Sequence, residues 1–250
     1  MNKNYLIVGA GFSGTVIAEQ LAKRENCKIL IVDARSHIGG NCYTEEDQET
    51  GIIVHKYGPH IFNTNNKDIW EYICQFCEMI PFINRVKTIY NGQIYSMPIN
   101  LHTINQFFAK ALSPKEAQML IERESDKSII EPKNFEEQAL KFIGKNLYNA
   151  FFYGYTKKQW GCEPSELPST ILKRLPIRFN YDDNYYSNIY QGIPKNGYTA
   201  VFDKMLSHPN IKIQLNTKFN SEFNIKSYDH IFYTGPIDAF FNYKYGRLGY

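Results

Sequence analysis

The fold is decided by the stretch Tyr5-Leu6-Ile7-Val8-Gly9-Ala10-Gly11-Phe12-Ser13-Gly14. Its four apolar residues end at a glycine, which predicts a buried parallel strand. Residues 15–24 then have the apolar spacing of a helix, and 28–33 predicts a second buried strand. The segment is therefore one complete β-α-β unit whose first turn carries a G-x-G-x-x-G loop.

The three glycines of this loop serve a dinucleotide in different ways. Gly9 permits the tight turn, Gly11 lets the backbone approach a pyrophosphate, and Gly14 lets helix and strand pack closely. The helix start that follows offers free N–H groups and a partial positive charge to the phosphates. Asp33 lies 19 residues after Gly14, at the end of the second strand, where a carboxylate binds ribose hydroxyls. This context favours dinucleotide binding over a plain glycine turn.

The stretch Arg35-Ser36-His37-Ile38-Gly39-Gly40-Asn41 indicates which dinucleotide. Two adjacent glycines just past the ribose acid permit a second close approach to the backbone. A long, extended flavin cofactor needs that approach, whereas a nicotinamide dinucleotide does not. The apolar strand 229–234, followed by Gly235, is a further flavoprotein-like feature. A simple turn at the glycine pair is the alternative.

The stretch His55-Lys56-Tyr57-Gly58-Pro59-His60-Ile61-Phe62 is a third unusual segment. Gly58-Pro59 interrupts regular structure and leaves His60 on a constrained turn. A histidine there can bond or polarise the edge of a flavin ring, or it can be a structural histidine with no such role.

The middle of the chain has a different pattern. An Asn-Gly pair between 86–90 and 93–97 predicts a β-hairpin. From about 102 to 161 the pattern is helical, with helix starts at Ser113 and Asn134 and a helix stop at Gly144. Residues 161–176 are rich in proline and indicate a loop with one short helix, which suits either movement or an ordinary surface connection.

These patterns predict the α/β fold class, with a discontinuous Rossmann-like FAD-binding domain that a hairpin and a helical segment interrupt. The family resemblance described below implies the rest of the plan, an inserted helical substrate domain and part of an antiparallel sheet domain. The expected bounds are 1–80 and 193–236 for the FAD-binding domain, 101–176 for the helical domain with its mobile loop 161–176, and 81–100, 177–192 and 237–250 for the sheet portions.

Composition excludes several classes. The net charge of +3 is too small for a nucleic-acid footprint, and no sequence window reaches the length of a membrane span. The five scattered cysteines argue for a reducing cytoplasm and against a disulfide framework. Cys74 and Cys77 form a C-x-x-C inside an apolar helical stretch, which favours packed or half-exposed thiols over a metal or redox site.

The order of the motifs resembles bacterial UDP-galactopyranose mutases along the whole stretch from Tyr5 to Tyr250. The motifs are G-x-G-x-x-G, H-I-G-G-N, H-K-Y-G-x-H-I-F, G-Y-T-x-K-Q-W-G, K-R-x-P-x-R-F, Y-Q-G-I-P and Y-T-G-P-I-D. Amine-oxidase-like flavoproteins are similar only in the first two motifs and the Thr-Gly strand.

The resemblance implies an isomerase that interconverts UDP-galactopyranose and UDP-galactofuranose without net redox change. In the family, reduced FAD is thought to form a covalent adduct with the sugar at its anomeric carbon and to expel UDP, which later returns. We further expect a homodimer in the cytoplasm, without nucleic-acid partners.

The resemblance also implies site residues. Those expected at the cofactor are Gly9, Gly11, Phe12, Ser13, Gly14, Asp33, Ala34, Arg35, Gly39, Gly40, Asn41, His55, Tyr57, Gly58, His60 and Gly235. Those expected at the substrate are Asn84, Phe151, Tyr155, Thr156, Trp160, Arg174 and Tyr185, and we expect His60 and Arg174 to be catalytic.

The chemistry of these side chains also favours a substrate site. Phe151, Tyr155 and Trp160 form an aromatic cluster at a helix end that can stack on uracil, with helix core as the alternative. Arg174 has the planar fork that clamps a diphosphate, and Tyr185 resembles a diphosphate-bonding tyrosine. Lys173 and Arg178 are expected to be solvated charges.

The family extends past residue 250 by about half of this length. That extension contains a second diphosphate arginine, two further tyrosines and a Gly-Arg-Leu-type flavin motif. Two other functions stay open. One is an oxidising flavoenzyme of the amine-oxidase type, and the other is a fragment that binds FAD or UDP-sugar without turnover.

Overall fold

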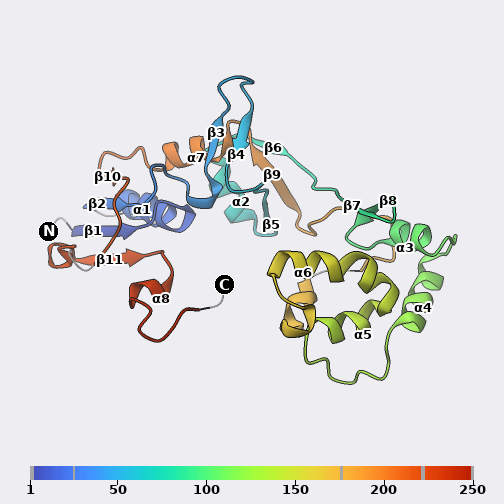
Figure 1. The fold of residues 1–250 in the computed structure, drawn as a ribbon. Helices are drawn as coiled ribbons and strands as arrows, with labels where there is room; N and C mark the ends of the chain where they lie inside the picture. The colour runs from blue at the N-terminus through green and yellow to red at the C-terminus, as the bar shows by residue number, and fades with distance from the viewer. Residues whose placement is uncertain (1–2, 25, 175–176, 221–222, 249–250) are drawn as a thin grey trace. The chain divides into compact units, whose positions relative to one another are not determined.

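The computed structural model describes residues 3–24, 26–174, 177–220 and 223–248, and the side chains of Lys173 and Arg174 also lie outside the description. The chain forms two compact units (Figure 1). The first contains residues 1–82 and 188–250, and the second contains 83–187. Parallel and antiparallel sheets occur together with helices, which confirms the α/β class.

A four-stranded parallel sheet is the centre of the first unit. Its strand order is β10-β2-β1-β11, with β1 at Lys3–Val8, β2 at Cys27–Val32, β10 at Ile211–Gln214 and β11 at His230–Tyr233. Helix α1 (Phe12–Arg24) connects β1 to β2, so the predicted β-α-β unit is confirmed. Strands from the two ends of the chain lie side by side in this sheet, as the blue and red arrows show (Figure 1).

The sheet is apolar because Leu6, Ile7 and Ile31 are buried on it. Helix α7 (Gly197–Met205) contributes a second buried cluster. Its Val201 and Met205 pack with residues of α2 (Lys67–Cys74) and the turn after it. Short 3-10 turns at Gly40–Cys42 and Ile225–Ser227 and a short helix α8 (Ile237–Phe240) complete the helical parts of this unit.

Two small antiparallel sheets extend the first unit. One pairs β3 (Thr44–Glu46) with β4 (Ile53–His55), and the other has the order β5-β9-β6. Its strands are β5 at Phe62–Thr64, β9 at Tyr190–Pro194 and β6 at Met79–Pro81. Of the segments 81–100, 177–192 and 237–250, the first two each span both units, Pro81 pairs with Gly192 in this sheet, and the described part of the third contains helix α8 and no strand.

The second unit begins with the hairpin β7 (Val86–Tyr90) and β8 (Gln93–Met97), whose bounds agree with the sequence prediction. Asn91 and Gly92 both have positive φ, at 49° and 75°, which is the geometry of a type I′ turn. The remaining helical elements are α3 at Leu101–Phe107, α4 at Pro114–Glu124, α5 at Phe135–Tyr148, a π-helix at Asn149–Tyr153, α6 at Gly154–Trp160 and 3-10 turns at Pro164–Glu166 and Ser169–Arg174.

Local capping determines where two of these helices begin. Ser113 and Glu116 form a complete capping box at α4, and the Asn134 side chain accepts from the Glu137 N–H at α5. Both predicted helix starts are therefore confirmed. The predicted helix stop at Gly144 is confirmed, since its φ of 76° and ψ of 168° are not helical and divide α5 into two helical stretches at a kink. A Cβ on Gly144 would lie 2.3 Å from the Glu124 carbonyl oxygen, so the kink lets α4 approach closely.

The core of the second unit joins the hairpin to the helices. Tyr95, Ile104, Ile143 and Leu147 are buried there. None of the helices over the described ranges is long and apolar enough to cross a membrane.

Candidate cofactor and substrate sites

The first glycine loop leaves no room for side chains at two of its positions. Gly9 has φ +106°, and a Cβ there would lie 2.2 Å from Thr234 Oγ1. A Cβ on Gly14 would lie 1.9 Å from the carbonyl oxygen of Gly9. The turn after β1 and the close approach of α1 to the sheet therefore both require glycine.

The second glycine pair lies directly against the first loop. A Cβ on Gly40 would lie 3.1 Å from Gly11 Cα, and the Gly39 N–H donates to the Ala10 carbonyl at 2.8 Å. Gly39 and Gly40 both have positive φ, at 91° and 56°. Two backbone segments without side chains thus meet at the end of β1 and form a cradle, which a Cβ would fill.

The Asp33 carboxylate accepts hydrogen bonds from backbone N–H groups beside this cradle. Its Oδ2 accepts from the Ala10 N–H and its Oδ1 from the Arg35 N–H, both at 2.8 Å. A carboxylate has about four acceptor positions, so each oxygen retains a lone pair for a ribose hydroxyl. The half-buried Asp33 can therefore hold the loop and accept from a ligand at once.

The segment after Asp33 forms an aromatic and cationic cluster. Arg35 Nη2 donates to Asn41 Oδ1 at 2.8 Å, and the guanidinium lies 4.5 Å from the centre of the Tyr57 ring. His37 Nε2 lies 2.6 Å from the Tyr57 hydroxyl, and its ring stacks on Tyr43. Sequence reasoning predicted Arg35, Asn41 and Tyr57 here but missed His37, although His37 belongs to the quoted H-I-G-G-N motif.

Other predicted cofactor residues have simpler surroundings. Ala34 and Ser13 are exposed. The Phe12 ring packs on Tyr198 and Phe202. The group that Phe12 can offer to a cofactor is therefore its backbone N–H at the start of α1. At Gly235 a Cβ would lie 2.8 Å from the Tyr233 ring.

His55 and His60 are linked through the turn between them. The His60 N–H donates to His55 Nδ1 at 3.2 Å, and His60 Nδ1 lies 2.8 Å from the Gly58 carbonyl oxygen. Burial lowers the pKa of His55, and the nearby His60 lowers it further. Gly58 has φ +96°, which the tight turn requires. A neutral His55 therefore fixes the backbone of His60, whose role at a flavin stays a prediction.

The predicted substrate residues of α6 differ in exposure. Tyr155 and Trp160 are exposed, at 69% and 46%, and Gly161 ends the helix with a left-handed φ of 69°. Thr156 is buried, and Phe151 is only 7% exposed and packs among Tyr90, Tyr95 and Phe107. Stacking surface is thus available on Tyr155 and Trp160, whereas the Phe151 ring lies in the core.

Asn84, Tyr155 and Tyr185 lie together on the second unit. The Tyr185 N–H donates to the Asn84 carbonyl at 2.8 Å. Burial raises the pKa of Tyr185, and the nearby hydroxyls of Tyr155 and Tyr186 raise it further. The structure therefore brings three of the predicted substrate residues to one place.

The Arg174 side chain lies outside the described residues, and so does that of Lys173. Arg178 is described, and its expected role as a solvated charge is wrong. Its side chain is only 10% exposed and donates to carbonyl groups of the following loop. Buried guanidinium groups need such partners, and a single sequence does not reveal them.

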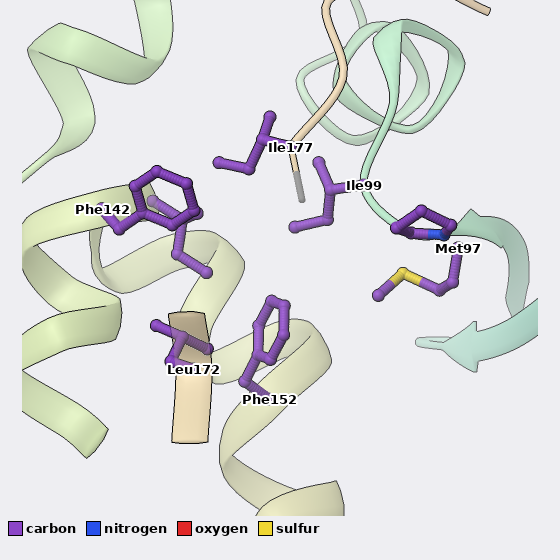
Figure 2. Close-up of a pocket in the computed structure, with 8 residues that line it drawn as sticks. Met97, Ile99, Phe142, Phe152, Leu172 and Ile177 are labelled. Atoms are coloured by element: carbon purple, nitrogen blue, oxygen red, sulfur yellow. The ribbon is translucent and has the colours of Figure 1, made fainter. Parts of the chain in front are cut away.

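The second unit contains a small apolar cavity. Figure 2 shows Ile99, Phe142, Phe152, Leu172 and Ile177 pointing toward a common centre. The enclosed space is about 10 Å³, near the minimum for one water, and its lining side chains are apolar. It is therefore a packing gap and not a ligand site, and Phe152 is a core residue.

The cysteines have no arrangement suited to metal or redox chemistry. All five are free. Burial raises the pKa of Cys77 to about 11 and also raises the pKa of Cys74. Because the thiolate is the reactive form, the raised pKa values disfavour reactivity at both thiols, of which Cys74 is exposed and Cys77 half-buried. Among the described residues, no group of three or more histidine, cysteine or acidic side chains could hold a metal ion.

Comparisons with known proteins agree with both units. A family model described as UDP-galactopyranose mutase matches residues 150–250, and one described as an NAD(P)-binding Rossmann-like domain matches residues 7–76. A probable UDP-galactopyranose mutase of Klebsiella pneumoniae is 59% identical over all of this chain, which covers 64% of that relative. A dTDP-fucopyranose mutase of Escherichia coli is 53% identical, again over the whole chain, which covers 67% of it.

Solved structures share the fold at lower identity. A crystal structure of reduced UDP-galactopyranose mutase has a TM-score of 0.69 at 19% identity, with 96% of this chain and 57% of that chain covered. A putative protoporphyrinogen oxidase from Exiguobacterium has a TM-score of 0.55 at 14% identity, over 94% of this chain and 60% of that one. The chain thus spans about two thirds of the length of its curated relatives. By these matches, the chain belongs to the UDP-galactopyranose mutase family.

Proposed function

We propose that this chain provides the cofactor site and part of the substrate site of an enzyme that interconverts UDP-galactopyranose and UDP-galactofuranose with reduced FAD. One observation carries the proposal. Two side-chain-free backbone segments meet at Gly11 and Gly40, next to the acceptor oxygens of Asp33. A pyrophosphate with an attached ribose needs that combination.

The residues of the first unit fit an adenine–flavin dinucleotide. The N–H groups at the start of α1 and the Gly11–Gly40 cradle would hold the pyrophosphate. Asp33 would accept from the ribose, and Arg35, fixed by Asn41 and Tyr57, would provide positive charge nearby. Gly39, Gly58, His60 and Gly235 remain proposed contacts of the same cofactor.

The second unit supplies surfaces suited to a nucleotide diphosphate. Tyr155 and Trp160 offer exposed rings for stacking on uracil and sugar. The Tyr185 hydroxyl is protonated near neutral pH, as tyrosine ordinarily is, so it can donate to a phosphate oxygen. We propose that Arg174 completes the diphosphate clamp.

Reduced FAD, when bound, would supply the nucleophilic nitrogen that exchanges with UDP at the anomeric carbon. The chain's own residues have to hold UDP while it is detached from the sugar. Hydrogen bonds from Tyr185 and Arg174 would stabilise the charge that develops on the leaving diphosphate and keep it in place for its return.

The experiment is turnover by the full-length protein. Reduced with dithionite, it is incubated with UDP-galactofuranose and, separately, with dTDP-fucofuranose, because relatives act by name on both nucleotide sugars. Chromatography should show UDP-galactopyranose and no net oxidation. Peroxide formation with an oxidised sugar would instead support an amine-oxidase-type enzyme. Folded protein that converts neither substrate would refute the proposal.

A cytoplasmic homodimer is a further part of the proposal. Five cysteines without a disulfide support a reducing compartment. Light scattering after size-exclusion chromatography tests the dimer directly, and a mass of one chain would contradict it.

A further inference from the structure

We propose that Arg178 is a positioning residue that sets the direction of Tyr185, an inference that rests on the proposed function. Residues 178–187 form neither helix nor strand. Their shape must therefore come from bonds outside regular structure, and the half-buried guanidinium of Arg178 makes three of them.

The guanidinium of Arg178 reaches three points along the loop ahead of it. Its Nη1 donates to the carbonyls of Asp182, at 3.3 Å, and Asn184, and its Nη2 donates to Ser187 Oγ at 2.9 Å. Asp182 Oδ2 also lies 3.4 Å from Nη1. Only a planar fork with several fixed donors makes these bonds together, so lysine cannot replace it.

The start of the loop is attached to the core of the second unit. The Arg178 N–H donates to the Ile99 carbonyl, and the Asn180 carbonyl accepts from the Leu101 N–H, both at 2.9 Å. Arg178 therefore links the β8–α3 connection, through its backbone N–H, to the carbonyl of residue 184, through its guanidinium.

The middle of the loop is attached to the hairpin through Asp183. Its Oδ1 accepts from Arg85 Nε at 3.0 Å, and its Oδ2 accepts from Lys87 Nζ at 3.2 Å. Although burial alone would raise the pKa of Asp183, the bonds from Lys87 and Arg85 lower it. The carboxylate is thus held in its charged form.

Tyr185 follows these two attachments directly. Its N–H donates to the Asn84 carbonyl, and its ring meets Tyr186 edge-on at 5.1 Å. Its peptide neighbour, residue 184, is held by Arg178. A loss of the guanidinium would release the carbonyls on either side of Asp183 and with them the backbone that orients the Tyr185 side chain.

The test is a double-mutant cycle in the full-length protein with Arg178→Lys and Tyr185→Phe, read on KM for UDP-galactofuranose and on Kd for UDP. Arg178→Lys should raise both constants about 10-fold, because a hydrogen bond to a charged phosphate is lost. In the Tyr185→Phe background it should change them less than about 2-fold. Arg123→Lys, an exposed arginine on α4, is the matched control and should change neither.

Equal effects of Arg178→Lys in both backgrounds would overturn the inference, since a merely structural role does not depend on the Tyr185 hydroxyl. Ser187→Ala, which removes one bond of the fork, serves if Arg178→Lys fails to fold, and its effect should also vanish in the Tyr185→Phe background. Wild-type protein that binds UDP but does not turn over would overturn the proposed function alone, because the cycle in Kd still decides the role of Arg178.

Discussion

Substitution of Gly11 by alanine should separate cofactor binding from folding. A Cβ on Gly11 would meet only Gly40 Cα, at 3.8 Å, which is ordinary van der Waals contact. Gly11 also lacks the positive φ of Gly9, Gly39 and Gly40, so alanine causes no backbone strain there. We therefore expect the apo protein to keep its stability within about 1 kcal/mol.

The same methyl group would occupy the space through which a pyrophosphate reaches the backbone. Overpacking of this kind costs about 1–3 kcal/mol, which is about 5- to 150-fold in affinity. The assay is FAD titration of the apo full-length protein, followed by flavin fluorescence, beside urea denaturation without FAD. Gly154→Ala, on a helix with open space around it, is the control and should leave the Kd for FAD unchanged. Wild-type affinity in Gly11→Ala would refute the assignment of the cradle.

Three further predictions concern stability. Gly14→Ala should destabilise the protein by about 3 kcal/mol in urea denaturation, because its Cβ would lie 1.9 Å from the Gly9 carbonyl oxygen, and a loss under 1 kcal/mol would contradict this. Ser113→Ala removes the α4 capping box and should cost about 1 kcal/mol by the same method, with an unchanged midpoint as the contrary result. Asp183 has a lowered pKa when folded, so its stabilising effect is present above its ordinary pKa of about 3.9 and is lost as pH falls through the folded value. Asp183→Asn should therefore weaken the dependence of stability on pH below about 4, and an identical acid profile would argue against the ion pairs.

The parts of the fold that the sequence predicted are those that depend on neighbours in the chain. Asn91-Gly92 determines a two-residue turn by its own backbone preferences, and Ser113 with Glu116 caps a helix within one turn. The glycine loop after β1 was recognisable for the same reason. Each signal is complete within a few residues.

The features that sequence reasoning missed depend on residues far apart in the chain. Strand β9 pairs with β5 and β6, more than a hundred residues earlier, and no local pattern specifies that register. Arg178 is a residue type common at exposed surfaces, yet bonds to residues 182, 184 and 187 hold its side chain, which is only 10% exposed. Gly144 was predictable as a helix stop, but its close contact with Glu124 of α4 was not.

The central claim is that the first unit holds FAD, and the most direct test is the visible absorption spectrum of the full-length protein after incubation with FAD and gel filtration. We predict flavin bands that travel with the protein in a ratio near one FAD per chain, and their loss in Gly11→Ala. A folded protein that elutes colourless after saturation with FAD would contradict the account.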